Sequence, residues 1–156
     1  MRKTVLWCVG NPLLRDDGVG PALYRLLSES PAEGIDAVDC GVTPENYAAP
    51  LLRLSEGDEK PLLIVVDASD MGLQAGAIRR LAAEDLPDSL FNSHGVPLSM
   101  ILAPLIGDID LVVIGIQPAE RGLGEGLSQA ASRSVDLLAR LLREGRWGEI
   151  EPYQEN

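Results

Sequence analysis

The sequence predicts an α/β fold: a three-layer α/β/α sandwich around a mostly parallel sheet with a mixed edge. Short apolar runs alternate along the chain with segments of helical periodicity, an order typical of right-handed crossovers between parallel strands. The run 61–67 is continuously apolar, which indicates a strand covered by helices on both faces. The short run 76–81 follows a loop, and we expect it to form an antiparallel edge strand.

The first third of the chain reads as strand, loop, helix and strand. Residues 4–9 are β-branched, aromatic and apolar, which predicts a buried strand. The loop 10–21 follows, framed by glycines, and leads into a helix with apolar positions at Ala22, Leu23, Leu26 and Leu27. Residues 35–39 alternate weakly and predict a second strand that stops at a glycine.

The remaining elements alternate in the same way. Thr43-Pro44-Glu45 is typical of a helix start, with Thr43 as N-cap, and we expect Pro50 to kink or split that helix. After the central strand, the acidic segment 82–93 is expected to be irregular and exposed. The later expected elements are a short helix over 97–104, a buried strand over 110–117, a glycine-rich loop over 120–126 and a helix over 128–143.

Composition limits the classes of function. With 156 residues, 46% of them apolar, the chain is expected to form one domain, 1–156, and the absence of a long apolar run predicts a cytoplasmic protein. A net charge of −11 disfavours nucleic acid as a partner. Two cysteines do not make a disulfide framework, and without an extended heptad seam we expect a monomer.

Candidate functional residues gather where the sheet should present its carboxyl edge. Asp17 follows the first strand, Asp67 ends the central strand and His94, the one histidine, precedes a short helix. Two carboxylates and an imidazole make a plausible open site for a divalent transition metal. In the first loop, Leu13 and Leu14 are expected to anchor one side of the pair Asp16-Asp17.

Other interpretations of these residues stay open at this point. Asp16 or Asp17 can simply cap the following helix, and a single histidine is more often structural than a ligand. A catalytic Ser-His-Asp triad that uses His94 is disfavoured, because the sequence has no Gly-x-Ser-x-Gly turn. A catalytic Cys40–His94 pair is not excluded. The loop 10–20 lacks the signatures of phosphate binding. Gly115, inside a strand, indicates close approach by a neighbouring backbone or a ligand.

Four motifs in order resemble the [NiFe]-hydrogenase maturation endopeptidases, and most closely the type that processes hydrogenase 3 of the formate hydrogenlyase system. They are Gly10-Asn11-Pro12-Leu13-Leu14-Arg15-Asp16-Asp17-Gly18-Val19-Gly20-Pro21, Val66-Asp67-Ala68-Ser69-Asp70-Met71-Gly72, His94-Gly95-Val96-Pro97-Leu98 and Gly115-Ile116-Gln117-Pro118. The resemblance covers nearly the whole chain. It implies a phosphorylase/hydrolase-like sandwich, and it places the family's metal-binding and catalytic residues at Asp17, Asp67 and His94.

The resemblance also implies a reaction. Members of this family remove a C-terminal extension from the hydrogenase large-subunit precursor once nickel is in place, and the nickel that the substrate carries is the recognition element. Whether the metal polarises the scissile carbonyl or activates water, or a carboxylate acts as general base, is left open. A non-catalytic, nickel-checking chaperone of the same precursor and a small flavodoxin-like binding domain are the alternatives. Arg15 stands where the family often has glycine, which puts the substrate subtype in question.

Overall fold

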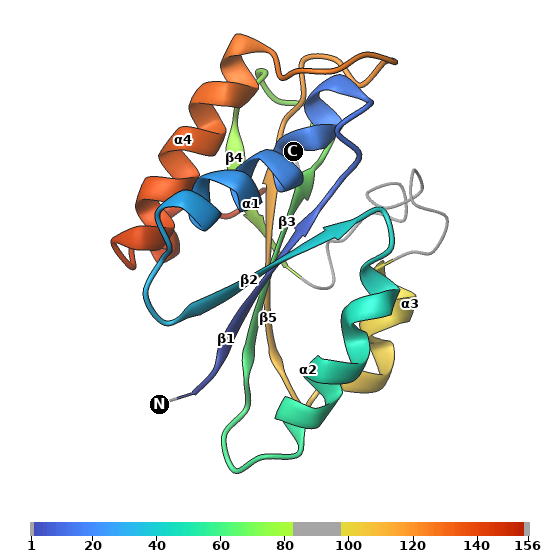
Figure 1. The fold of residues 1–156 in the computed structure, drawn as a ribbon, viewed down its shortest axis with the longest axis vertical. Coiled ribbons are helices and arrows are strands. Elements are labelled where there is room, and N and C mark those ends of the chain that lie inside the picture. The colour runs from blue at the N-terminus through green and yellow to red at the C-terminus, as the bar shows by residue number, and fades with distance from the viewer. Residues whose placement is uncertain (1, 83–97, 155–156) are drawn as a thin grey trace.

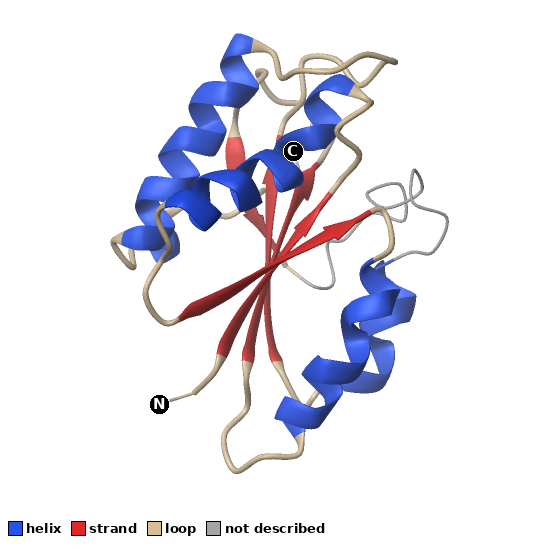
Figure 2. Ribbon diagram, in the orientation of Figure 1, coloured by secondary structure: helices blue, strands red, loops and turns tan. Residues whose placement is uncertain are grey.

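The computed structural model describes residues 2–82 and 98–154, and these form a five-stranded sheet with helices on both faces (Figures 1 and 2). The strand order is β2-β1-β3-β5-β4; the first four in this order are parallel, and β4 pairs with β5 antiparallel. The predicted mixed edge is therefore confirmed. The strands are β1 (Thr4–Val9), β2 (Ile35–Gly41), β3 (Leu62–Ala68), β4 (Ile78–Leu81) and β5 (Asp110–Ile116).

The helices make the outer two layers. Figure 1 shows α1 (Val19–Glu29) and α4 (Gln129–Arg143) on one face of the sheet, and α2 (Ala48–Ser55) and α3 (Leu98–Leu102) on the other. Alternate side chains of β1 enter the two cores, with Leu6 on the α1–α4 side and Trp7 on the α2–α3 side. Every residue of β3 is buried, as the continuous apolar run predicts.

The helix expected after Thr43 is split, but earlier than Pro50. A 3₁₀ turn over Pro44–Tyr47 precedes α2. Thr43 is the N-cap residue of this turn, as predicted, but its hydroxyl makes no capping hydrogen bond, so that part of the prediction is wrong. Pro50 is the third residue of α2. Its missing N–H would have had no intrahelical partner in the first turn, so α2 runs through this proline unbroken.

Gly20 sets the distance between the first helix and the first strand. A Cβ atom at Gly20 would lie 2.2 Å from the carbonyl oxygen and 2.5 Å from the nitrogen of Val9. The helix backbone therefore passes directly over the end of β1, which fixes the loop between them. The helix starts at Val19, three residues before the predicted apolar stripe.

The C-terminal segment, which has no periodic pattern, packs along the outer edge of β4. Backbone hydrogen bonds join Arg80 N–H to the Glu151 carbonyl and Tyr153 N–H to the Arg80 carbonyl, at 2.9 and 2.8 Å. Ile150 is buried, and Trp147 packs against the core on the α1–α4 side. This segment therefore pairs with the edge that β4 would otherwise expose.

Several expectations fall outside the described residues. The region 83–97 contains His94, Pro97 and most of the segment expected to be irregular, and the short helix is described from Leu98 onward, followed by a 3₁₀ turn at Ala103–Leu105. Within the described ranges, no helix is long and apolar enough to cross a membrane. Cys8 and Cys40 are both buried free thiols and belong to different cores.

Candidate functional site

The first loop and the end of the central strand meet at the carboxyl edge of the sheet. Residues Arg15–Gly18 form a 3₁₀ turn that contacts β3, and Asp67 is the penultimate residue of that strand. Asp17 and Asp67 are both buried, each with about 1% of its surface exposed. The structure thus brings two of the three sequence-predicted residues to one edge, as the parallel topology requires.

Asp17 has one satisfied oxygen and one unsatisfied oxygen. Oδ2 accepts a hydrogen bond from the backbone N–H of Asn11 at 2.9 Å, whereas Oδ1 is buried and finds no donor among residues 2–82 and 98–154. Gly10 makes this geometry feasible, because a Cβ there would lie 2.0 Å from the Asp17 carbonyl oxygen. A buried carboxylate oxygen without a donor is unfavourable, so it indicates a position kept for a ligand.

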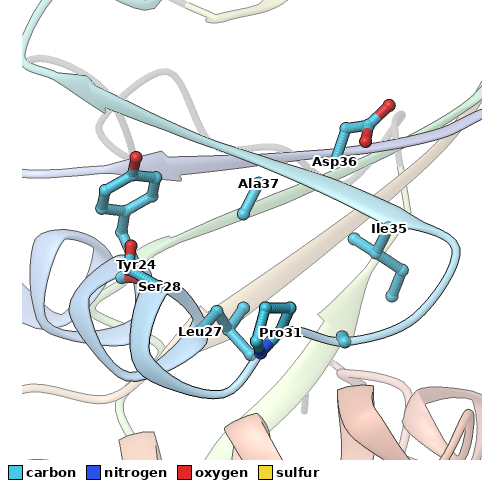
Figure 3. A pocket seen from close by; sticks show the side chains of 8 residues that line it. Tyr24, Leu27, Ser28, Pro31, Ile35, Asp36 and Ala37 are labelled. Carbon is cyan, nitrogen blue, oxygen red and sulfur yellow. Dashed lines mark hydrogen bonds between the residues drawn. The ribbon is translucent and has the colours of Figure 1, made fainter.

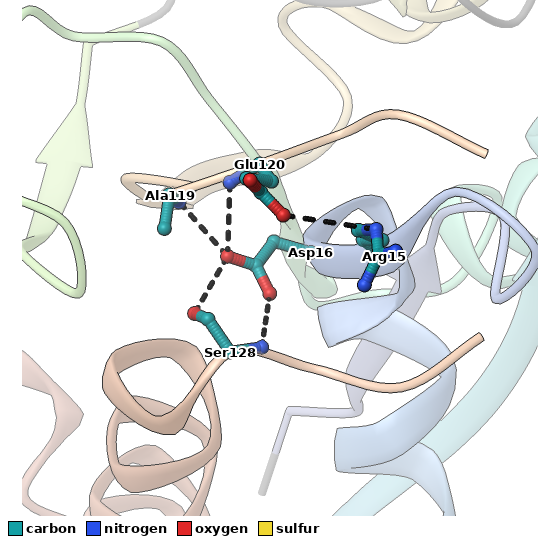
Figure 4. Close-up of polar contacts among 5 residues, drawn as sticks. All are labelled: Arg15, Asp16, Ala119, Glu120 and Ser128. Atoms are coloured by element: carbon teal, nitrogen blue, oxygen red, sulfur yellow. Dashed lines mark hydrogen bonds and ion pairs between the residues drawn. The ribbon is translucent and has the colours of Figure 1, made fainter. Parts of the chain in front are cut away.

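Asp16, its neighbour, is fully satisfied within the protein (Figure 4). Oδ1 accepts from the Ser128 N–H at 2.7 Å; Oδ2 accepts from the Ser128 hydroxyl at 2.7 Å and from the N–H groups of Ala119 and Glu120 at 2.8 and 3.4 Å. Burial alone would raise the pKa of Asp16, but the hydrogen bonds from Ser128, Ala119 and Glu120 outweigh it and leave the pKa below the ordinary value.

The partners of Asp16 show what it does. Ser128 is the N-cap of α4, where its hydroxyl also accepts from the Ala131 N–H at 3.2 Å. Asp16 therefore ties the first loop to the start of the last helix. The prediction that one acid of the pair serves a helix start is thus partly right: the acid is Asp16, but the helix is α4 and not the adjacent α1.

Asp67 leads into a tightly held loop. Its Oδ1 accepts from the N–H of Ala68 at 2.8 Å, and Ser69 is completely buried, with a hydroxyl that finds no partner within the described part of the chain. A Cβ at Gly115 would lie 2.9 Å from the Ser69 Cβ. The close neighbour that Gly115 admits is therefore a side chain, where the sequence suggested a backbone or a ligand.

Gln117 is a residue of this edge whose role sequence reasoning missed. Its Oε1 accepts from the N–H groups of Met71 and Leu73 at 2.7 and 3.2 Å, and its Nε2 donates to Asp70 Oδ1 at 3.2 Å. The last bond contributes most to holding the pKa of Asp70 below its usual range. Gln117 thus clamps the loop after Asp67; its position directly after a strand adjacent to β3 is the signal that could have found it.

The first loop does not anchor as predicted. Leu13 is 52% exposed, so only Leu14 is in a position to help fix the loop, and a backbone bridge between Leu14 and Gly124 joins it to the segment before α4. Arg15 N–H donates to the Gly124 carbonyl at 2.8 Å, and its guanidinium lies 3.7 Å from the Glu120 carboxylate. Figure 4 shows Arg15 beside Glu120, whereas the Asp16 carboxylate faces Ser128 and Ala119.

Arg15 has a backbone conformation that suits glycine. Its φ of 48° is the one positive value at a non-glycine position in the described chain. We expect Arg15→Gly to be more stable than Arg15→Ala by about 1 kcal/mol, because both variants remove the side chain and only alanine keeps the left-handed strain. Urea unfolding of the two variants measures the difference. Equal stabilities, or a more stable alanine variant, would contradict this account of the loop.

The third predicted residue, His94, lies outside the described residues. Within 2–82 and 98–154, no group of three His, Cys, Asp or Glu side chains is arranged to hold a metal ion. Asp16 therefore does not join Asp17 and Asp67 as a third carboxylate ligand. A third His, Cys, Asp or Glu ligand beside Asp17 and Asp67 would have to come from the remaining part of the chain, where His94 is located.

A separate hollow lies at the opposite end of the sheet (Figure 3). This pocket of about 260 Å³ is lined by the C-terminal half of α1 and the first residues of β2, including Tyr24, Leu27, Pro31 and Ile35. Since β1 and β2 are parallel, the start of β2 is remote from the carboxyl edge. This pocket is therefore not part of the candidate site.

Comparison with known proteins supplies the context for this edge. The family described as hydrogenase maturation protease (HycI) matches residues 22–144. The hydrogenase 3 maturation protease of Escherichia coli K12 is 32% identical over 148 residues, which cover 92% of each chain. The solution structure of the endopeptidase HycI from Escherichia coli has a TM-score of 0.85 at 30% identity and covers 97% of each chain.

An archaeal structure has the same architecture. The crystal structure of a [NiFe] hydrogenase maturation protease HycI from Thermococcus kodakarensis has a TM-score of 0.77 at 27% identity, with 92% of each chain covered. The pairwise similarity therefore extends over almost the whole chain, and the family match over 22–144 includes Asp67 and the α4 segment.

Proposed function

Because this chain belongs to the hydrogenase maturation protease family, we propose that it removes a C-terminal extension from a [NiFe]-hydrogenase large-subunit precursor after nickel insertion. The chain is a protease of this family. The substrate type is proposed to be that of hydrogenase 3, since 92% of the chain aligns with the hydrogenase 3 maturation protease of Escherichia coli.

We propose Asp17, Asp67 and His94 as the residues that contact the nickel carried by the precursor and as the catalytic set. The observation that carries this proposal is the buried, unpartnered Oδ1 of Asp17 at the edge to which β3 also delivers Asp67. Hydrogen bonds within the protein satisfy both carboxylate oxygens of Asp16. In this proposal Asp16 is therefore the structural acid of the pair, and Asp17 is the ligand.

The donor set fits a nickel ion that arrives with the substrate. Carboxylate oxygens with an imidazole nitrogen suit a divalent transition metal, and two carboxylates with one imidazole leave positions for the ligands that the precursor itself provides. Nickel held in this way would supply a Lewis acid next to the peptide bond. The protein's own part is to hold Asp17 rigidly, through the Asn11 N–H and the tie between Asp16 and α4.

The test is a processing assay on purified components. The chain is mixed with nickel-loaded or nickel-free large-subunit precursor, and the mass of the large subunit is measured by intact-protein mass spectrometry. We expect the loss of a C-terminal peptide from the nickel-loaded precursor alone.

Each other outcome contradicts a definite part of the proposal. Cleavage of both precursors would show that nickel does not license the reaction. A stable complex without loss of mass would favour a nickel-checking chaperone over a peptidase acting on this substrate. If the chain neither binds nor cleaves the precursor, the substrate assignment is wrong.

A further inference from the structure

A second pocket lies beside the first loop, and its charge is opposite to that of the chain. This pocket of about 290 Å³ is lined by residues of the loop, of α1 and of the segment that leads into α4, among them Pro12, Arg15, Gly18, Arg25, Gly126 and Leu127. No aspartate or glutamate is among its described lining residues. The chain as a whole has 24 acidic residues and 13 lysines and arginines, so two arginines without an acid are unusual for it.

Arg25 is available to a ligand. It is exposed on α1, and within residues 2–82 and 98–154 it makes no ion pair or hydrogen bond. Within the described part of the chain, the one ion pair of the Arg15 guanidinium is the 3.7 Å approach to Glu120, in which both side chains are partly exposed, and such pairs contribute little to stability. Neither guanidinium is therefore committed to the fold.

The backbone holds Arg15 in place despite the strain. A Cβ at Gly124 would lie 3.1 Å from the Cζ and Nη2 atoms of Arg15, so the missing side chain at Gly124 makes room for the guanidinium. The Gly124 N–H donates to the Leu13 carbonyl at 2.8 Å, and its carbonyl accepts from Arg15 N–H at 2.8 Å. A non-glycine residue kept at positive φ and fixed from both sides indicates a functional constraint.

We propose that the pocket between Arg15 and Arg25 binds a carboxylate of the peptide substrate, and that Arg15 is a specificity-determining residue. The pocket adjoins the loop that carries Asp17, so a peptide chain held at the carboxyl edge can reach it. A guanidinium pair recognises a carboxylate through charge-assisted hydrogen bonds. The identity of the ligand rests on the proposed function; the existence of the binding site does not.

The experiment is an NMR titration of the ¹⁵N-labelled full chain, observed at the arginine Nε–H groups and backbone amides. The probes are three acetylated tripeptides and inorganic phosphate. One peptide has a free C-terminal carboxylate, one has a glutamate side chain and an amidated end, and one is amidated without any carboxylate.

We expect saturable shifts at Arg15, Arg25 and Gly126 with the two carboxylate peptides. Arg25→Gln should weaken this binding by about tenfold, because a charge-assisted hydrogen bond is lost. Arg53→Gln, the matched control on the exposed surface of α2 at the opposite face of the sheet, should leave it unchanged. The peptide that binds with the lower Kd shows whether the pocket prefers a C-terminal carboxylate or a glutamate side chain.

Three results would overturn the proposal: equal binding of the peptide without a carboxylate, binding of phosphate alone, or unchanged affinity in Arg25→Gln. A second measurement uses the processing assay, in which Arg15→Gln and Arg25→Gln should each raise KM by about tenfold with kcat unchanged. If the wild-type chain processes no precursor, the proposed function fails, while the peptide titration still decides whether the pocket binds carboxylates.

Discussion

Asp17→Asn is expected to lower the rate of precursor processing by about 100-fold or more while leaving the folded protein at least as stable as the wild type. Asparagine can still accept from the Asn11 N–H through its carbonyl oxygen, so the loop keeps its hydrogen bond. What is lost is the negative charge and the buried, unpartnered Oδ1 that we propose as the contact to nickel. The substitution replaces a buried ionised group by a neutral amide, which costs less free energy to bury, so the fold is not expected to lose stability.

The measurement combines the processing assay with thermal unfolding followed by circular dichroism. Asp108→Asn is the control, because it removes the same charge from an exposed residue just before β5, at the opposite end of the sheet. Asp108→Asn should change neither the processing rate nor the Tm. An Asp17→Asn variant that processes precursor at the wild-type rate would remove Asp17 from the site, whatever its stability.

The sheet could be predicted from the sequence because each strand carries its own signal. The continuous run before Asp67 indicates burial on both faces, and the structure shows β3 at the centre of the sheet with every residue buried. The short antiparallel strand at Ile78 was also predicted correctly. The 3₁₀ turn before α2 was not, because Thr43-Pro44-Glu45 has the composition of an α-helix start and local composition does not determine which turn forms.

The packing of the C-terminal segment could not be predicted from the local sequence pattern either. Residues around Pro152 pair with β4 through backbone hydrogen bonds, which any residue except proline can donate and which leave no periodicity in the sequence. Three large side chains mark this segment as attached to the two cores: Trp147 and Ile150 on the α1–α4 side, and Tyr153 on the α2–α3 side.

The candidate site was predictable in location but not in the division of roles. Parallel topology explains why Asp17 and Asp67 come to the same edge. The difference between Asp16 and Asp17 depends on Ser128 and Ala119, which are more than 100 positions away in the sequence and approach only after α4 has packed. Sequence spacing contains no information about that contact, so the two acids looked equivalent.

The second large effect concerns stability and belongs to Asp16. Asp16→Asn is expected to lower the free energy of unfolding by about 3 kcal/mol, equivalent to a fall in Tm of about 6–12 °C. All the groups that face this carboxylate are donors: the N–H groups of Ala119, Glu120 and Ser128 and the Ser128 hydroxyl. An amide nitrogen in place of either oxygen leaves a buried donor facing another donor.

The pH dependence of this loss has a definite sign. Because hydrogen bonds hold the folded pKa of Asp16 below the ordinary value of about 3.9, the carboxylate contributes its full stabilisation above that value. The contribution is lost as the pH falls through the folded pKa. The stability difference between wild type and Asp16→Asn should therefore be constant from pH 7 to about 5 and should narrow below about 4.

Urea unfolding across that pH range measures this difference, with Asp108→Asn again as the control for loss of an exposed carboxylate. At a temperature where both variants are folded, Asp16→Asn should also process more precursor than Asp17→Asn, because it keeps the Asp17 side chain. A stability difference that grows at low pH would mean that Asp16 is not ionised in the fold. Equal unfolding midpoints for wild type and Asp16→Asn would mean that the tie to α4 does not stabilise the protein. The hydrogen bonds at this edge therefore predict that the same substitution has different effects at the two adjacent aspartates. Asp16→Asn lowers mainly the stability, and Asp17→Asn lowers mainly the rate of processing.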